Sequence, residues 1–148
     1  MVNANQRISD QVVLAATIDP DAYGTGAQNS DWVAMSTFEA ILATVYAGTL
    51  GASATLDAKL QQATDGSGTG AKDITGKAIT QLTKAGSDDD KQAIIECRSE
   101  ELDVANSFTH VRLVVTIGTA ASDAAATIHG VAARYMATNL ASVDERVF

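Results

Sequence analysis

The sequence predicts an all-β fold, a single antiparallel β-sandwich of about eight strands. Residues 108–118 form the clearest strand, because apolar and polar side chains alternate along nearly the whole segment, as in a strand that buries one face. Gly, Asn, Asp and Ser recur between several such segments, at a spacing that suits a sandwich better than alternating strands and helices. The length of 148 residues fits one domain with one core.

The first half of the chain predicts three strands. The first covers residues 11–18 and ends at Asp19-Pro20-Asp21, because proline lacks the N–H that a strand ladder needs. A loop rich in Gly, Asn and Ser over residues 22–30 leads to a short strand at residues 32–35. Residues 38–47 are apolar on both parities, which predicts a central strand covered on both faces, with a helix as the alternative.

The next strand and its loop lie between residues 55 and 70. Residues 55–61 alternate cleanly, so Leu56, Ala58 and Leu60 are predicted to face the core. Residues 62–70 contain three glycines at every second position, which predicts a hairpin tip. A phosphate-binding loop is the alternative, but no Lys-Ser or Lys-Thr pair follows in the required register.

A further strand region covers residues 71–83, with a bulge or kink at Gly76. Ser87-Asp-Asp-Asp90 then predicts a solvated turn. A calcium site is the alternative, but three consecutive carboxylates point in different directions. The strand over residues 91–98 follows this turn.

Residues 99–103 predict one helical turn that crosses between the sheets, with Ser99 as its cap. The strand at residues 108–118 comes next, and after the loop at residues 119–124 the last strand covers residues 125–135. In the strand at residues 108–118 the residues predicted to face the core are Thr109, Val111, Leu113, Val115 and Ile117, and those predicted to face outward are His110, Arg112 and Thr116.

These patterns predict an N-terminal arm (residues 1–10), a sandwich domain (residues 11–135) and a C-terminal arm (residues 136–148). Unpatterned arms commonly gain order on a partner, so the apolar residues Ile8, Val147 and Phe148 are candidate partner contacts. His110 and Arg112 are two further candidates, because they are predicted to face outward and to meet a neighbouring subunit. The last ten residues and the first ten are the predicted attachment segments.

The charge of the chain disfavours two classes of partner. Ten Lys and Arg against 18 Asp and Glu give a formal net charge of -8, which repels nucleic-acid phosphates and anionic lipid headgroups. We therefore expect neither nucleic acid nor membrane as a partner. Seven of the carboxylates lie between Asp88 and Asp103, either as a solvated loop and strand edge or as a surface for a basic partner.

The chain lacks a recognisable catalytic or metal-binding pattern, so we expect no enzyme activity, no cofactor and no metal. Cys97 shares its parity with Ile95, which predicts a small buried hydrophobic residue rather than a nucleophile. His110 and His129 have no carboxylate or cysteine at zinc-ligand spacing. No Gly-x-Ser-x-Gly motif is present.

Four aromatic residues suggest an alternative function. Tyr23, Trp32, Tyr46 and Tyr135 carry flat faces of the kind that stack on sugar rings. They are scattered along the chain, and filling the core at strand ends is the commoner use of such residues. A carbohydrate-binding β-sandwich module is therefore an alternative to a structural role.

Three segments resemble a known class of proteins. They are Trp32-Val-Ala-Met-Ser-Thr-Phe38, Leu56-Asp-Ala-Lys-Leu-Gln-Gln-Ala-Thr-Asp65, and Glu101-Leu-Asp103 followed by Phe108-Thr-His-Val-Arg-Leu113. Together they resemble small β-sandwich virion proteins of tailed bacteriophages, namely capsid decoration, cement and head-fibre proteins, which are often jelly rolls. The likeness covers roughly residues 30–135 and rests on framework residues of strands and turns.

The resemblance implies a jelly-roll-like structural protein that is made in the host cytoplasm and is bound to the outer surface of the phage head. Its partners would be the major capsid protein or other virion subunits, and a homotrimer is the expected oligomer. Many copies that each bind weakly then suffice, because several contacts per oligomer add avidity. A tail, neck or baseplate component of the virion is the alternative within the same class.

Overall fold

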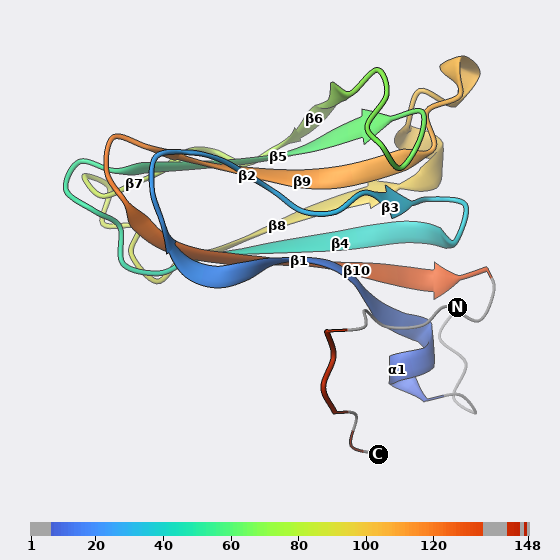
Figure 1. Cartoon of the computed structure of the whole chain (residues 1–148), viewed down its shortest axis with the longest axis horizontal. Coiled ribbons are helices and arrows are strands. Elements are labelled where there is room, and N and C mark those ends of the chain that lie inside the picture. The colour runs from blue at the N-terminus through green and yellow to red at the C-terminus, as the bar shows by residue number, and fades with distance from the viewer. Residues whose placement is uncertain (1–6, 135–141, 146, 148) are drawn as a thin grey trace.

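The computed structural model describes residues 7–134, 142–145 and 147. Two antiparallel sheets pack face to face (Figure 1), and the described helices are all short. None of them is long and apolar enough to cross a membrane. The elements are α1 (Ile8–Gln11), β1 (Val12–Tyr23), β2 (Gly26–Asn29), β3 (Val33–Ala34), β4 (Phe38–Ala47), β5 (Thr55–Ala63), β6 (Lys72–Ala78), β7 (Leu82–Thr83), β8 (Gln92–Arg98), the 3-10 helices η1 (Ser99–Glu101) and η2 (Val104–Asn106), β9 (His110–Gly118) and β10 (Ser122–Ala133).

The strand order confirms the predicted sandwich and makes it a jelly roll. One sheet has the order β1-β10-β4-β8, and the other has the order β2-β9-β5-β6, with β3 paired to β9 and β7 paired to β5. Counting β2 with β3 and β6 with β7 as two interrupted strands leaves eight. Their chain order is then 1-8-3-6 in one sheet and 2-7-4-5 in the other, which is the double Greek key of a jelly roll.

The core lies between the two sheets and follows the alternation in the sequence. Leu56, Ala58 and Leu60 on β5 are buried as predicted. On β9, Val111, Leu113, Val115 and Ile117 are buried as well. The prediction that Thr109 faces the core is wrong, because Thr109 is exposed and precedes β9. Its hydroxyl donates to the carbonyl oxygen of Thr64 at 2.9 Å.

Strand β1 continues past the predicted end at Ile18 and includes Pro20. The register with β10 shifts between Ile18 and Asp21, so Pro20 lies where the ladder is already interrupted. Strand β1 is also the outer strand of its sheet. A proline at an edge bulge removes no necessary hydrogen bond, and the strand therefore resumes and runs to Tyr23.

Two predicted loops contain strand residues. The loop predicted at residues 22–30 includes β2, which pairs with residues 114–117 of β9. The loop predicted at residues 119–124 includes the start of β10 at Ser122. In both cases cross-strand pairing with a neighbour overrides the weak strand propensity of Gly, Asn, Ser and Asp.

Strand β4 is central in its sheet, between β10 and β8, as predicted, so the helical alternative is wrong. The prediction that both faces are covered is also wrong. Ile41, Ala43 and Val45 face the core, whereas Leu42 is only half-buried and Tyr46 is 41% exposed on the other face. The apolar residues of the second parity therefore belong to an open surface.

The crossover between the sheets contains the predicted helical turn as η1. Ser99 is the first residue of this turn rather than its cap; the backbone N–H of Arg98 donates to the Glu101 carboxylate at 2.7 Å. The Ser99 hydroxyl accepts a hydrogen bond from Arg134 at 2.8 Å. The bulge predicted at Gly76 is confirmed, because Gly76 has φ +77° and lies in the part of β6 where the register with β5 shifts.

Candidate interaction surfaces

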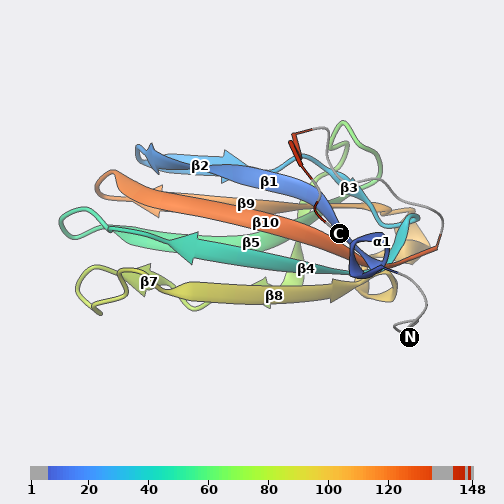
Figure 2. The ribbon, with the colours of Figure 1, turned by 90° about the horizontal axis from the view of Figure 1, so that it is seen from below.

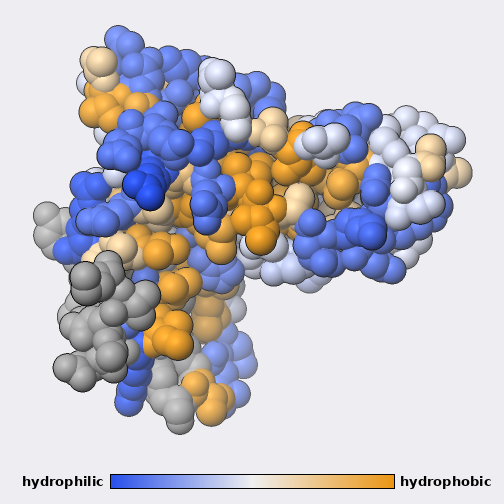
Figure 3. Space-filling model, turned by 180° about the vertical axis from the view of Figure 1, so that it is seen from behind, coloured by the Kyte–Doolittle hydropathy of each residue, from blue (hydrophilic) through white to orange (hydrophobic). Residues whose placement is uncertain are grey.

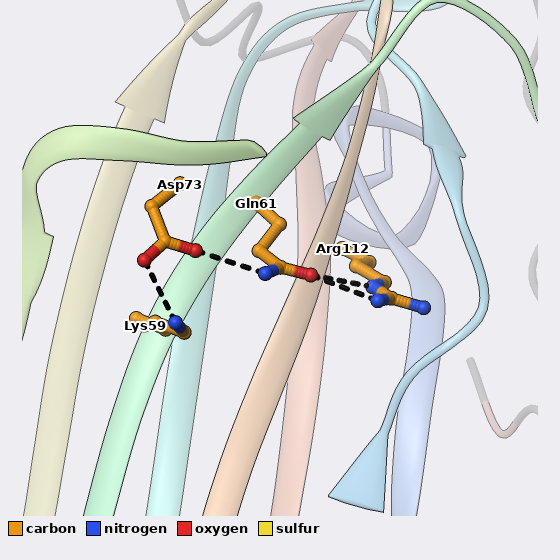
Figure 4. Close-up of polar contacts among 4 residues, drawn as sticks. All are labelled: Lys59, Gln61, Asp73 and Arg112. Carbon is orange, nitrogen blue, oxygen red and sulfur yellow. Dashed lines mark hydrogen bonds and ion pairs between the residues drawn. The ribbon is translucent and has the colours of Figure 1, made fainter. Parts of the chain in front are cut away.

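The outer face of the β2-β9-β5-β6 sheet is polar, and its groups bond one another (Figure 4). The Lys59 ammonium lies 2.7 Å from the Asp73 carboxylate, which also accepts a hydrogen bond from Gln61 at 2.9 Å. The Gln61 carbonyl in turn accepts two hydrogen bonds from Arg112, at 3.1 and 2.8 Å. The hydrogen bonds from Lys59 and Gln61 lower the pKa of Asp73. This chain of contacts links β6, β5 and β9 and satisfies its own donors and acceptors.

Arg112 also covers an aromatic ring. Its guanidinium lies 4.6 Å from the centre of the Trp32 ring, within range of a cation–π contact. At the edge of the same ring, a Cβ added to Gly68 would lie 2.9 Å from the indole nitrogen. Trp32 therefore packs between Arg112 and the glycine loop.

The aromatic residues do not form one platform. Trp32 precedes β3 in the six-stranded sheet, whereas Tyr23 ends β1 and Tyr46 lies on β4 in the other sheet. Tyr135 lies outside the described residues. Tyr23 packs against the core and Tyr46 is exposed on the outer face of its sheet, so Trp32, Tyr23 and Tyr46 do not share one sugar-stacking surface.

The glycine loop at residues 65–70 uses its amides internally. The Asp65 carboxylate accepts hydrogen bonds from the backbone N–H of Ser67 at 2.9 Å and of Thr69 at 3.0 Å. Hydrogen bonds from Thr69 are the main reason that the pKa of Asp65 is lowered. Two amides that a phosphate would need are already bonded to a carboxylate, which supports the hairpin-tip prediction over the phosphate-binding alternative.

The two histidines lie in different sheets, and the single cysteine is buried. His110 lies on β9 and His129 lies on β10, in different sheets. Cys97 is fully buried, and burial raises the pKa of its thiol to about 11. Within the described part of the chain, no three His, Cys, Asp or Glu side chains form a group that could hold a metal ion.

The aspartate turn at residues 87–90 is held by its own carboxylates. The Asp89 carboxylate accepts a hydrogen bond from the Leu50 amide at 2.8 Å and from Lys84 at 2.6 Å. The neighbouring Asp88 accepts one from the Thr83 amide at 2.9 Å. The two carboxylates therefore bond to different backbone segments, as the turn prediction requires.

The outer face of the β1-β10-β4-β8 sheet is different, and we call the part of it that β1, β10 and β4 form the uncharged face. Its side chains are apolar, threonine or histidine, in register across the sheet. Thr17, Thr127 and Thr44 form the central row, and the Thr127 hydroxyl is buried without a hydrogen-bond partner in the described structure. The uncharged face consists of Val12, Leu14 and Thr17 on β1, Ala125, Thr127, His129 and Val131 on β10, and Ala40, Leu42, Thr44 and Tyr46 on β4.

Desolvation favours the neutral form of His129, the histidine on the uncharged face. His129 lies between Leu14 and Leu42. Partial burial lowers the pKa of its imidazole from the usual value of 6.5, so the ring is uncharged at pH 7. A surface that lacks charge over several strands is typical of a contact surface rather than of a freely solvated face.

Segments near both ends of the chain lie on this same side of the molecule. Figure 1 shows α1 and residues 142–145 below β1 and β10. Ile8 is 73% exposed and Val147 is 85% exposed. Together with Leu14 and His129 they help to line an open cavity of about 620 Å³, and the remaining lining residues are Arg7, Ser9 and Val12.

The predicted partner contacts that the structure describes therefore lie on two different sides of the molecule. Ile8 and Val147 come together beside the uncharged face, and Phe148 lies outside the described residues. His110 and Arg112 lie on the opposite sheet, where Arg112 bonds within its own chain. Sequence reasoning missed the uncharged face, although the second apolar parity of residues 38–47 is its signal.

The class that these observations define is a jelly-roll β-sandwich with one polar and one uncharged outer face. No protein-family model and no curated protein matches the chain. Among solved structures, the chain is similar to an infectious bursal disease virus (Gx strain) structure, with TM-score 0.41 and 12% identity over 84% of this chain and 32% of that one. It is also similar to a chain of the cowpea mosaic virus empty virus-like particle, with TM-score 0.42 and 11% identity over 99% and 95%. A third similarity, to Bacillus endospore appendages, has TM-score 0.31 and 15% identity over 88% and 98%. These likenesses are distant and assign no function.

Proposed function

We propose that this chain is a structural, non-enzymatic protein of a bacteriophage particle, a decoration or cement protein on the outer surface of the head. The observation that carries the proposal is the uncharged face, beside which the exposed residues Ile8 and Val147 also lie. The sequence resemblance to phage head proteins supplies the class of particle. The major capsid protein is the proposed partner.

The physical argument concerns where a chain of net charge -8 can dock. Burying an unpaired charge in an interface is costly, whereas apolar and threonine side chains lose little on leaving water. The uncharged face meets this condition. The polar face, with Lys59, Asp73 and Arg112 already paired, is suited to remain in solvent.

The proposed oligomer is a homotrimer, which gives several weak contacts with the shell at once. Light scattering of the purified chain tests it through the molar mass in solution. A mass that is a multiple of three chains is expected, and any other mass would contradict the trimer.

The experiment that tests the location is imaging of labelled protein on intact particles. A decoration protein appears over the whole head, whereas a tail, neck or baseplate component appears at one vertex or along the tail. Removal of residues 1–10 or of residues 139–148 is expected to weaken co-sedimentation with capsids assembled without the protein. Full binding by both truncated forms would exclude the terminal segments as attachment sites.

The carbohydrate-binding alternative is tested by titration with host polysaccharides. Trp32→Ala distinguishes the two functions, because Trp32 is covered by Arg112 and lies far from the uncharged face in the other sheet. Polysaccharide binding that disappears in this variant would favour the alternative. Capsid binding that survives in it is the result expected here.

A further inference from the structure

Three of the four sheet edges are interrupted in ways that prevent pairing with another strand. Strand β1 has two register shifts against β10 and contains Pro20. The edge formed by β2 and β3 is broken into strands of four and two residues. The edge formed by β6 and β7 has a register shift and the positive-φ residue Gly76. Short, bulged or proline-containing edges are how proteins block edge-to-edge association.

Strand β8 is the exception among the described strands. It is the edge strand of its sheet and pairs with β4 over seven consecutive residues without a register shift. Figure 2 shows β8 at the margin of the sheet. Within β8, Ile94 is 62% exposed. Figure 3, which views the molecule from behind, shows apolar side chains gathered in the middle of this side.

We propose that β8 pairs antiparallel with β8 of a second copy of this chain, about a two-fold axis at Ile94. The pairing would join two four-stranded sheets into one sheet of eight strands. A two-fold contact of this kind is self-complementary, because every residue pair occurs twice. The partner is a second copy because the side chains along β8 complement one another in this register.

The register follows from the outward-facing residues of β8 and the turn before it. With Ile94 opposite Ile94, Gln92 lies opposite Glu96, and Arg98 lies beside the turn that precedes the partner's β8 and contains Asp90, which has φ +58°. Apolar contact and opposite charges across neighbouring strands both stabilise a sheet. Arg98 is available for this contact, since its distance to Glu100 is 3.6 Å and both side chains are more than 70% exposed.

Other registers are worse on the same criteria. Residues opposite each other in an antiparallel pair must face the same side. The partner of a given residue therefore shifts by two residues when the two-fold axis moves by one residue along β8. A pairing centred on Ile95 places Ile94 opposite Glu96, and one centred on Glu96 places two carboxylates together. A pairing centred on Ala93 places Glu96 at the level of Asp90. Like charges directly opposite are destabilising, which disfavours the registers centred on Glu96 and Ala93. An exposed isoleucine opposite a carboxylate loses the apolar contact, which disfavours the register centred on Ile95.

The two-fold axis is perpendicular to the sheet, so both uncharged faces point to the same side. Two copies then present two uncharged faces on the same side, separated by the paired β8 strands. The contact is distinct from a three-fold contact: it gives a dimer from single chains, and a hexamer from trimers when the two-fold and three-fold axes cross at right angles. In either case, disrupting β8 pairing halves the mass of the assembly.

A disulfide test reads the register directly. In an Ile94→Cys variant the two introduced residues lie opposite each other, with Cα atoms about 5 Å apart, within disulfide range. In the control Glu96→Cys the two introduced residues are offset by four positions, about 13 Å apart. The native Cys97 is buried, so it does not compete.

Mild oxidation of the full-length Ile94→Cys protein is expected to give a disulfide-linked dimer on a non-reducing gel, and Glu96→Cys is expected to remain unlinked. Equal cross-linking of both variants would overturn the proposal. So would the absence of cross-linking in Ile94→Cys while its circular dichroism spectrum matches that of the unmodified chain.

A mass measurement supplies an independent test. Ile94→Lys places two ammonium groups at the two-fold axis and is expected to halve the molar mass measured by light scattering. Val104→Lys is the matched control, since Val104 is equally exposed at 61% but lies in η2, away from β8. An unchanged mass in Ile94→Lys, or an equal loss in Val104→Lys, would contradict β8 pairing.

Discussion

At the scale of single residues, Gln62 stabilises the crossover between the two sheets. Its side chain is buried, and its carbonyl accepts a hydrogen bond from the Asp103 backbone N–H at 2.8 Å. Asp103 lies between η1 and η2, in the segment that carries the chain from β8 to β9. One amide side chain thus satisfies a backbone donor that helical or strand pairing leaves unbonded.

Gln62→Ala is therefore expected to lower the free energy of unfolding by about 1–3 kcal/mol, because it leaves the Asp103 N–H without its partner. Gln81→Ala is the control, since Gln81 is exposed and bonds only to Asp57 at the surface; a change below about 0.5 kcal/mol is expected there. Urea denaturation measures both. Equal effects of the two substitutions would contradict the role given to Gln62.

His129 gives the chain a pH dependence. Burial lowers its pKa in the folded state, so the unfolded chain binds the proton first as the pH falls. Stability is then present above the unfolded pKa of about 6.5 and is lost as the pH falls towards the folded value. Thermal denaturation between pH 7.5 and 5 should show this loss, and His129→Gln should reduce it. His110→Gln is the matched control, and it is expected to lose stability at low pH as the unmodified chain does. If the pH-dependent loss of stability disappeared in His110→Gln, the effect would belong to His110 and not to His129.

Several single-residue features could be predicted from the sequence. Cys97 was expected to be buried because it shares the parity of Ile95, and both are buried. Thr109 was expected to face the core for the same reason, but β9 begins one residue later. Parity identifies the face of a residue inside a strand, whereas it gives no information on where pairing begins.

At the scale of elements, β4 and β10 approach closely at one end. A Cβ added to Gly130 on β10 would lie 2.3–2.5 Å from ring atoms of Phe38 on β4, and Phe38 is buried. Glycine is required there because the aromatic ring fills the space of its missing side chain. The contact fixes how the first residue of β4 packs against the C-terminal part of β10.

Gly130→Ala is accordingly expected to destabilise the fold by about 1–3 kcal/mol through overpacking. The cost should be smaller in a Phe38→Leu background, because a smaller side chain relieves the clash. A double-mutant cycle measured by denaturation reports this coupling. Strict additivity of the two substitutions would show that the ring and the glycine do not interact.

The elements that the sequence misplaced share a cause. Strand β1 passes Pro20 because an edge strand tolerates a missing donor at a bulge, and β2 forms because β9 offers it a partner. Strand β4 was placed correctly at the centre of a sheet, but its second face was expected to be covered. Local patterns indicate which segments are strands; neighbours in space decide where strands end and which faces stay open.

At the scale of the whole molecule, the two outer faces differ in charge. Lys59, Asp73 and Arg112 keep the six-stranded sheet charged and internally bonded. The threonine and aliphatic rows of the other sheet leave a surface without charge. The sequence predicted that Ile8 and Val147 make contacts, and the structure places both beside this surface. The sequence did not indicate that the two other predicted contacts, His110 and Arg112, lie on the opposite sheet.

The central claim is that the uncharged face attaches the protein to the particle. The most direct measurement is co-sedimentation of Thr44→Lys with capsids assembled without the protein, compared with Thr116→Lys. Thr44 lies in the middle of the uncharged face and Thr116 lies on β9 of the opposite sheet, and both are half-buried. A buried unpaired ammonium should weaken binding by tenfold or more in Thr44→Lys, while Thr116→Lys binds as the unmodified chain does. Full binding by Thr44→Lys, or loss of binding in Thr116→Lys alone, would contradict the claim.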